Sequence, residues 1–303
     1  MSTLVIETEH VTKKFKQFTP VHDLSLQVKK GEVYGFLGPN GAGKTTTIRM
    51  LLGLITPTKG EVRIFGKSLP QNRLEIARKV GSLVESPSYY GHLTGYENLE
   101  VTRKLLGADN KDIARVLEIV RLTEWKNKKV KNYSLGMKQR LGIAQALLGQ
   151  PELLILDEPT NGLDPAGIHE IRDLIVNLPE KMGITVLVSS HILREVELMA
   201  DRVGIINRGH LLFQGELAEL QARSVPRLRI ETNRPHEAGQ WLLEAGYRVE
   251  RKEAMLYVDT DKSRAAEINR ELVIRGHDIW HVSEERESLE DIFLSLTSGV
   301  ESI

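Results

Sequence analysis

The sequence contains no cysteine and no excess of charge of either sign. The lack of cysteine excludes disulfide bonds and thiolate-bound metals, and it slightly favours the cytosol. Lysine and arginine together number 41, as do aspartate and glutamate, so the basic excess of a protein that coats nucleic acid is missing. We therefore expect no nucleic acid among the partners of this chain.

Long apolar runs are also missing. No stretch approaches the roughly 18 apolar residues that a membrane-spanning helix needs. The first residues, Met1 to Leu4, show neither the basic nor the apolar segment of a secretory signal. We expect a cytoplasmic chain, peripheral at the inner face of the cell membrane through a partner that holds it there.

Length and patterning predict an α/β core that carries two additions. The 303 residues exceed one typical domain of about 100–200 residues. Short strand-like segments at 4–9, 23–28 and 62–65 predict a β-rich flank. Helical spacing of apolar residues predicts a helical subdomain at about 86–150. Strands and helices then alternate over 153–206, which predicts a mostly parallel sheet. We expect this nucleotide-binding domain to span residues 1–223.

A smaller domain is expected over residues 227–303. Its strand-like and helix-like segments follow one another in the order βαββαβ, which is the arrangement of ferredoxin-like modules. The sequence therefore predicts a small α+β ferredoxin-like accessory domain at the C-terminal side of the core.

A glycine-rich loop follows the apolar segment 33–37 and matches the phosphate-binding pattern G-x-x-x-x-G-K-[ST]. Its glycines allow backbone N–H groups to turn inward around phosphate oxygens. Lys44 adds a positive charge at the β/γ-phosphates, Thr45 offers a hydroxyl to Mg²⁺, and the helix that follows presents its positive end. The residues expected to bind the nucleoside triphosphate are Gly38, Pro39, Asn40, Gly41, Ala42, Gly43, Lys44, Thr45 and Thr46.

Two adjacent carboxylates end the apolar strand 153–156. Alternation along a strand predicts that the side chains of Asp157 and Glu158 point to opposite sides. Asp157 can then reach the Mg²⁺ held by Thr45, and Glu158 can act on the attacking water as general base. The sequence therefore predicts a site that hydrolyses the nucleotide.

Residues 133–140 read Tyr-Ser-Leu-Gly-Met-Lys-Gln-Arg and open a helix just before the acidic strand. This segment resembles the signature motif of ABC ATPases. Residues 161–164 resemble the D-loop of that family, His191 its switch histidine and Phe15 its adenine-stacking aromatic. The resemblance covers the first two-thirds of the chain and implies a P-loop NTPase core of the ABC type that binds ATP.

The family resemblance implies a homodimer that sandwiches two ATP molecules. Ser134 and Gly136 of one copy would meet the γ-phosphate bound to the loop of the other copy, and Asp164 would contribute from the D-loop. Within the same copy, His191 would contact the γ-phosphate. Phe15 would stack on adenine, although core packing of Phe15 and a competing role for Phe18 stay open.

Four positions depart from the usual family motifs. The usual signature is Leu-Ser-Gly-Gly-Gln, and here Tyr133, Leu135 and Met137 differ while Ser134 and Gly136 remain. Leu135 and Met137 leave the fit of the composite site open. Where the family usually has glutamine, this chain has Glu85, resembling the variant loop of lantibiotic-immunity ATPases. Glu85 can face Mg²⁺ or the attacking water, or it merely caps a strand.

These assignments give two overlapping sets of residues. The expected catalytic residues are Lys44, Glu85, Glu158 and His191, and the expected ligands of Mg²⁺ are Thr45, Glu85 and Asp157.

The whole chain is similar to ATPase subunits of bacitracin-resistance and lantibiotic-immunity exporters. The similarity implies ATP hydrolysis with Mg²⁺, transport through a separate integral-membrane permease, and resistance or immunity to a peptide antibiotic. Two alternatives stay open: a non-transport ABC ATPase that acts on nucleic acid or ribosomes, and a regulator whose C-terminal module binds a small ligand.

Overall fold

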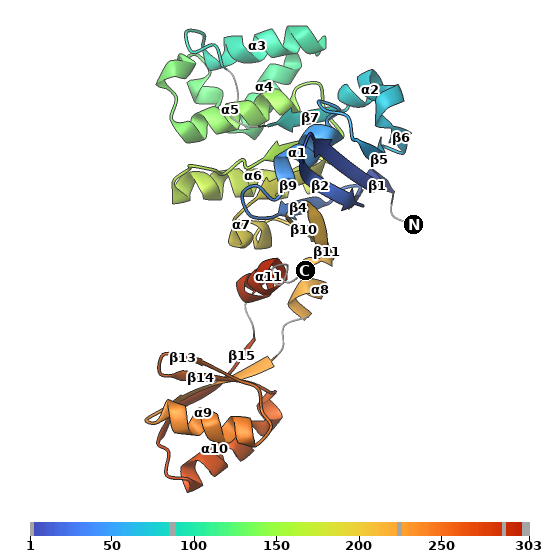
Figure 1. Cartoon of the computed structure of the whole chain (residues 1–303). Helices are drawn as coiled ribbons and strands as arrows, with labels where there is room; N and C mark the ends of the chain where they lie inside the picture. The colour runs from blue at the N-terminus through green and yellow to red at the C-terminus, as the bar shows by residue number, and fades with distance from the viewer. Residues whose placement is uncertain (1–2, 85–88, 223–225, 287–288, 299–303) are drawn as a thin grey trace. The chain divides into compact units, whose positions relative to one another are not determined.

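The computed structural model describes residues 3–84, 89–222, 226–286 and 289–298. The chain divides into two compact units, Met1–Leu217 and Ala218–Ile303, whose elements are labelled in Figure 1. This division lies near the boundary at residues 223 and 227 that the sequence predicts.

A six-stranded sheet in the order β11-β10-β4-β9-β8-β7 forms the centre of the first unit. The strands from β10 to β7 run parallel, and β11 pairs antiparallel with β10. Every residue of β4, β8 and β9 is buried, which explains the mostly apolar character of β4 and β8 and the apolar centre of β9. The strands are β4 (Val33–Leu37), β7 (Val80–Leu83), β8 (Leu153–Asp157), β9 (Thr185–Ser190), β10 (Arg202–Asn207) and β11 (His210–Glu216).

A second, antiparallel sheet is the predicted β-rich flank. Its order is β2-β1-β5-β6, and β3 also pairs with β1. The segment expected as one strand over 23–28 forms the end of β2 and the start of β3, because the strand is interrupted at Ser25 and Leu26. The strands are β1 (Leu4–Phe15), β2 (Phe18–Leu24), β3 (Gln27–Lys29), β5 (Lys59–Ile64) and β6 (Lys67–Ser68).

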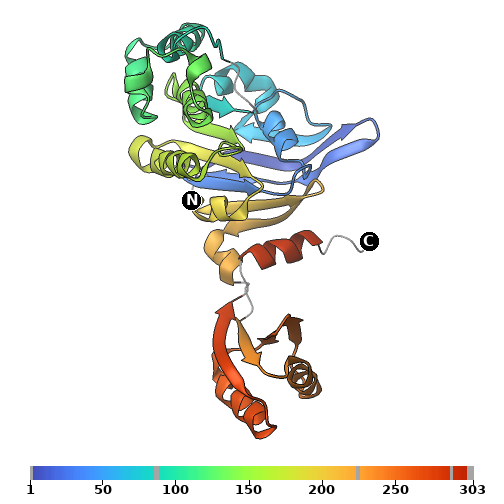
Figure 2. The same ribbon diagram turned by 90° about the vertical axis from the view of Figure 1, so that its left-hand side faces the viewer.

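Helices pack on both sheets of the first unit. The helical subdomain consists of α3, α4 and α5, which lie together beside the β7 end of the central sheet (Figures 1 and 2). One buried cluster joins this subdomain and α6 to the central sheet, and another fills the space between the two sheets and α1. The helices are α1 (Lys44–Leu51), α2 (Leu69–Ala77), α3 (Gly95–Leu106), α4 (Lys111–Ile119), α5 (Leu135–Leu147), α6 (Pro165–Met182) and α7 (Leu193–Glu197), with 3-10 turns at Thr123–Trp125 and Val130–Asn132. A further helix, α8 (Leu217–Ala222), begins at the last residue of this unit and otherwise belongs to the second unit.

The second unit contains the predicted βαββαβ order. Its sheet runs β13-β14-β12-β15 with all neighbouring strands antiparallel, and α9 and α10 cover one face (Figure 1). The elements are β12 (Pro226–Thr232), α9 (Pro235–Glu244), β13 (Val249–Lys252), β14 (Met255–Asp259), a 3-10 turn (Lys262–Arg264), α10 (Ala265–Ile274), β15 (Ile279–Arg286) and α11 (Leu289–Ser298). Within the described residues of both units, no helix has the length and apolar character to cross a membrane.

Candidate active site

The glycine-rich loop connects β4 to α1 at the edge where the parallel strands end. Gly43 has a left-handed φ of 109°, and a Cβ atom there would lie 2.3 Å from the carbonyl oxygen of Pro20 in β2. A Cβ atom on Gly38 would lie 2.3 Å from the carbonyl oxygen of Ile206 in β10. Because backbone atoms cannot move aside as a flexible side chain can, only glycine fits these two positions.

Lys44 is the first residue of α1, and its side chain lies across the loop. It is 5% exposed, and its Nζ donates to the carbonyl oxygens of Gly38 at 2.6 Å and Pro39 at 3.3 Å. The same Nζ forms an ion pair with Glu158 Oε1 at 3.1 Å. The fold thus fixes one positive charge at the backbone that is expected to surround phosphate groups.

Thr45 and Asp157 form a set of oxygen donors beside the loop. The Thr45 hydroxyl donates to Asp157 Oδ2 at 2.9 Å, and the Ser189 hydroxyl at the end of β9 donates to Asp157 Oδ1 at 2.5 Å. Within the described ranges, no group of three or more histidine, cysteine, aspartate or glutamate side chains could hold a metal alone. One hydroxyl and one carboxylate fit Mg²⁺, which prefers oxygen ligands and commonly shares its coordination sphere with substrate phosphates.

Glu158 follows β8 in a left-handed conformation with a φ of 50°. Its N–H donates to Ser189 Oγ at 3.0 Å, and its Oε2 lies 2.6 Å from His191 Nδ1. The expectation from strand alternation does not apply here, because the left-handed backbone lies outside the regular strand. Glu158 and Asp157 consequently both reach the first turn of α1, through Lys44 and Thr45. Such backbone strain in a non-glycine residue is typical of functional sites.

The signature and D-loop segments lie next to each other on the surface. The exposed Ser134 caps α5, accepting a hydrogen bond from the Met137 N–H at 3.2 Å, and Asp164 caps α6. The Leu135 side chain lies 3.4 Å from where a Cβ atom on Gly162 would be. The variant residue Leu135 therefore adjoins the D-loop. Of the other two variant residues, Tyr133 belongs to the buried core and Met137 packs against it.

The structure brings together only some of the predicted site residues. Glu158 contacts both Lys44 and His191, and Thr45 contacts Asp157. Ser189 links these two groups. Three other residues were predicted to contact ATP from the signature and D-loop segments: Ser134, Gly136 and Asp164. In the described part of the chain, no hydrogen bond or ion pair joins them to the five predicted residues above. Glu85 lies outside the described residues.

Phe15 ends β1 and is 46% exposed, which excludes the alternative that it packs in the core. It pairs with Phe18 across the β1–β2 hairpin, and Phe18 is 63% exposed. The Lys13 ammonium lies 4.8 Å from the centre of the Phe15 ring. Both aromatic rings are thus exposed on the strand pair β1–β2, whose Pro20 contacts the phosphate loop. Either ring could therefore stack on adenine.

Sequence reasoning missed a buried network behind the site. Glu195 in α7 is 8% exposed and accepts hydrogen bonds from Thr160 Oγ1 at 2.5 Å and Ser190 Oγ at 3.2 Å. Thr160 follows Glu158 by two residues, and Ser190 directly precedes His191. The serine pair before His191 was the available signal, because it places hydroxyl groups at the carboxyl end of a buried strand. Glu195 is thereby a positioning residue for both segments.

We expect Glu195→Ala to lower both stability and ATP turnover. The substitution leaves the buried Thr160 hydroxyl without its acceptor and removes one of the two acceptors of the Ser190 hydroxyl. This loss should reduce the free energy of unfolding by about 1–3 kcal/mol. Glu197→Ala on the same helix should change it by less than about 0.5 kcal/mol. Denaturant unfolding measures both variants, and Glu195→Gln, which keeps an acceptor oxygen, should recover part of the turnover. An unchanged unfolding midpoint for Glu195→Ala would contradict the positioning role.

The loop, its lysine and the adjoining carboxylates at the edge of a parallel sheet define a P-loop nucleoside triphosphatase. The family profile described as ABC transporter matches residues 21–161. The chain is 45% identical to the bacitracin transport ATP-binding protein BcrA of Bacillus licheniformis, over 99% of both chains. It is 41% identical to the lantibiotic transport ATP-binding protein SrtF of Streptococcus pyogenes, over 70% of this chain and 91% of that protein. The chain therefore belongs to the ABC transporter family.

Solved structures agree with this assignment. An ATP-binding subunit of an ABC transporter matches with a TM-score of 0.65 and 30% identity, over 72% of this chain and 92% of that one. A dimeric ATP-binding cassette in a post-hydrolysis state, bound to ADP and Pi, matches with a TM-score of 0.64 and 28% identity. The match covers 70% of this chain and 98% of that one. The predicted ABC-type fold is confirmed, and the chain is an ATP-binding ATPase of a transporter.

Proposed function

We propose that this chain hydrolyses ATP to power export of a peptide antibiotic, of bacitracin or lantibiotic type, through a separate permease. The observation that carries the proposal is the similarity to the bacitracin transport protein along nearly the whole chain. The C-terminal unit is included in that similarity, whereas a match limited to the ATPase core would indicate only the superfamily.

The proposed hydrolysis relies on positioning and charge rather than on a covalent intermediate. The loop N–H groups and Lys44 bind the phosphates, and Phe15 stacks on adenine. Thr45 Oγ1 and Asp157 Oδ2 would hold Mg²⁺, which when bound neutralises charge on the phosphate oxygens. Glu85, which follows β7 in sequence, is proposed as a further carboxylate at this metal.

Glu158 is proposed as the general base. It lies at the end of β8 and is held from two sides, by Lys44 and by His191. In the ATP complex its carboxylate accepts a proton from the attacking water. His191, which is partly exposed beside Glu158, contacts the γ-phosphate and stabilises its developing charge.

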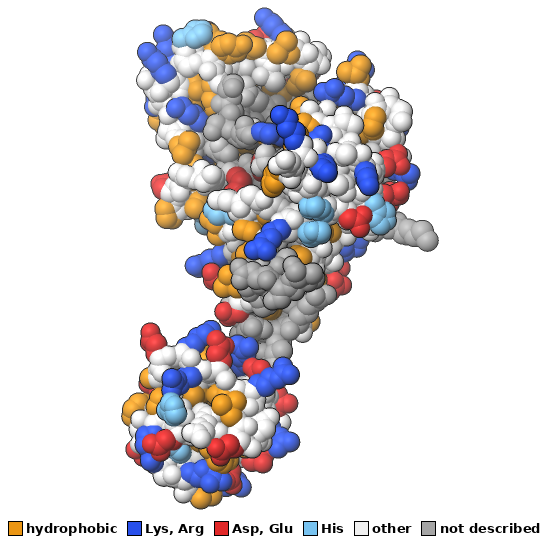
Figure 3. Space-filling model, in the orientation of Figure 1, with side chains coloured by type: hydrophobic (Ala, Val, Ile, Leu, Met, Phe, Trp, Pro, Cys, Tyr) orange, Lys and Arg blue, Asp and Glu red, His pale blue; other side chains and the backbone are white. Residues whose placement is uncertain are grey.

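Two copies of the chain are proposed to complete each site. Ser134 and Asp164 are exposed and have no hydrogen bond to Lys44, Thr45 or Glu158 in the described residues of one copy. The first turn of the 13-residue helix α5 can present its N–H groups to a γ-phosphate bound by the other copy. Charge argues against the nucleic-acid alternative, since basic and acidic side chains are interspersed on the face in Figure 3.

A permease segment is proposed to bind in a cleft of about 740 Å³ between β7 and the helical subdomain. Leu54 and Leu106 line this cleft and are 58% and 53% exposed. Nearby, burial raises the pKa of Tyr89, so its hydroxyl remains protonated and donates to the carbonyl oxygen of Lys138 in α5. That bond links Tyr89 to the signature helix α5, which itself lines the cleft through Gly142 and Gln145.

The test is affinity purification of a tagged Glu158→Gln chain from gently solubilised cells in ATP and Mg²⁺. We expect an integral-membrane protein at stoichiometric yield, which would also place the chain at the inner face of the membrane. Leu106→Glu in the same background should lose the partner, because it puts a charge in the cleft. Leu105→Glu is the matched control, since Leu105 is 82% exposed and lies outside the cleft lining. Recovery of ribosomes or nucleic acid instead would contradict the proposal.

A further inference from the structure

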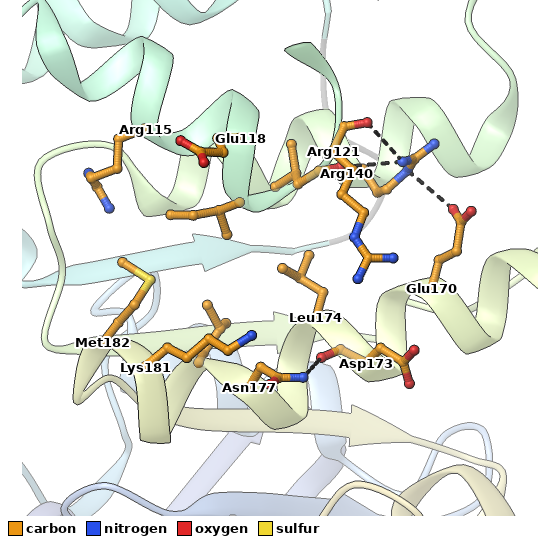
Figure 4. A pocket seen from close by; sticks show the side chains of 13 residues that line it. Arg115, Glu118, Arg121, Arg140, Glu170, Asp173, Leu174, Asn177, Lys181 and Met182 are labelled. Atoms are coloured by element: carbon orange, nitrogen blue, oxygen red, sulfur yellow. Dashed lines mark hydrogen bonds and ion pairs between the residues drawn. The ribbon is translucent and has the colours of Figure 1, made fainter. Parts of the chain in front are cut away.

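A second cavity, of about 400 Å³, lies between the helical subdomain and α6. Its lining comes from α4 and the turn after it, from Arg140 in α5 and from one face of α6 (Figure 4). None of the residues proposed to bind ATP, Mg²⁺ or the permease lines it. Its volume is in the range of small-molecule sites, which is about 300–1,000 Å³.

The wall of this cavity is apolar. Val120 and Leu178 are only 1% and 2% exposed, and both belong to the buried core of the first unit. Ile119, Leu174 and Met182 are partly buried and pack against the same core. The cavity is therefore backed by well-packed side chains and offers an apolar ligand a preformed surface.

Two cations at the cavity have no partner in the described part of the chain. Arg121 and Lys181 are exposed, and no ion pair or hydrogen bond of their side chains is present there. Figure 4 shows their charged ends pointing into the cavity from opposite sides, with Leu174 between them. An anionic group placed between them would gain charge-assisted hydrogen bonds without breaking an existing ion pair.

The other charged groups of the cavity are mostly engaged elsewhere. Arg140 donates to the carbonyl oxygens of Val120 and Arg121 and lies 3.5 Å from Glu170, and Asp173 pairs with His169 at 3.1 Å. The Glu118 carboxylate also lines the cavity, but in Figure 4 it lies toward Arg115 and away from Arg121. Arg115 Nη1 is buried without a hydrogen-bond partner, so this side also retains an unused donor.

We propose that this cavity binds a small amphipathic anion, a carboxylate with a single apolar chain. The carboxylate lies between Arg121 and Lys181, and the apolar chain covers Leu174 and Met182. A nucleotide fits poorly, because its polar ribose would face the apolar wall.

Decanoate and decanol are suitable probes, because they share the apolar chain and differ in charge. We expect the full chain, saturated with ATP and Mg²⁺, to bind decanoate more tightly than decanol in calorimetric titrations. The double variant Arg121→Gln/Lys181→Gln should weaken decanoate binding by about tenfold and leave decanol binding unchanged. The matched control Lys30→Gln/Lys111→Gln, which removes two exposed cations outside the lining, should bind both probes as the original chain does.

Four results would each overturn the proposal. They are equal affinity for decanoate and decanol, an equal loss of decanoate binding in the two double variants, decanoate binding by the chain only when ATP is left out, and binding of the chain to anionic lipid vesicles without any binding of decanoate. The last result would assign the two cations to a membrane surface instead of a soluble carboxylate. Leu174→Ala supplies an independent check, since removing apolar contact area should weaken decanoate and decanol to a similar degree.

Discussion

Glu158→Gln is expected to lower ATP hydrolysis by about 10²–10⁴-fold while ATP binding remains. Glutamine keeps the size of the side chain but cannot accept the proton of the attacking water. It also loses the negative charge that pairs with Lys44 at 3.1 Å, which frees the lysine ammonium for the phosphates. The variant should therefore bind ATP at least as well as the original chain and accumulate as an ATP-bound dimer.

Steady-state phosphate release and binding of a fluorescent ATP analogue separate these two effects. Size-exclusion chromatography in ATP and Mg²⁺ reports the dimer. Glu152→Gln is a matched control, because Glu152 directly precedes β8 at its opposite end and forms an exposed ion pair with Lys79 at 2.8 Å. Turnover in Glu158→Gln equal to that of the control would remove Glu158 from the role of base.

Mixing two inactive variants should restore ATP hydrolysis if each site is shared between two copies. Lys44→Ala removes the phosphate-binding charge, and Gly136→Asp places a carboxylate in the first turn of α5, where it repels the γ-phosphate. A Cβ atom on Gly136 would lie 4.0 Å from Leu163 Cδ2, so the larger residue fits, and an acidic residue there favours the helix. Each variant alone is expected to lose more than about 100-fold of its turnover.

In an equal mixture, half of randomly formed pairs contain one copy of each variant, and each such pair has one intact site. The mixture should therefore recover up to about one quarter of the original turnover. Phosphate release measured against total protein tests this expectation. The control for non-specific stabilisation is each variant mixed with the double variant Lys44→Ala/Gly136→Asp, which supplies neither half of a site. No recovery in the mixture would mean that the sites of the two copies do not combine.

Much of the fold could be predicted because its signals are local. The strands β4 and β8 are buried on both faces, so each reads as an unbroken apolar run. The C-terminal unit alternates short strands with helices whose apolar residues recur at helical spacing, and the predicted order agrees with the structure. The division between β2 and β3 was missed, because the two-residue interruption at Ser25 and Leu26 leaves no clear trace in hydrophobic periodicity.

The candidate site was predictable to a similar extent. The phosphate loop depends on glycines that avoid backbone clashes at fixed positions, and such a requirement is visible as a spacing of residue types. The conformation of Glu158 was not predictable from strand alternation, because the strand ends at Asp157. The roles of Ser189 and Glu195 also went unnoticed, since a serine or glutamate beside a strand or helix most often has no special function.

The sequence by itself determined that this chain has a loop for ATP phosphates, an acidic strand end and a second α+β domain. Each of these depends on backbone requirements or periodicities that involve neighbouring residues. Only the tertiary structure decided which side chains meet, such as Thr45 and Asp157, which are 112 positions apart. It also decided that Arg121 and Lys181 converge on one apolar cavity. Contacts between distant segments arise from how buried strands and helices pack, and no local pattern encodes them.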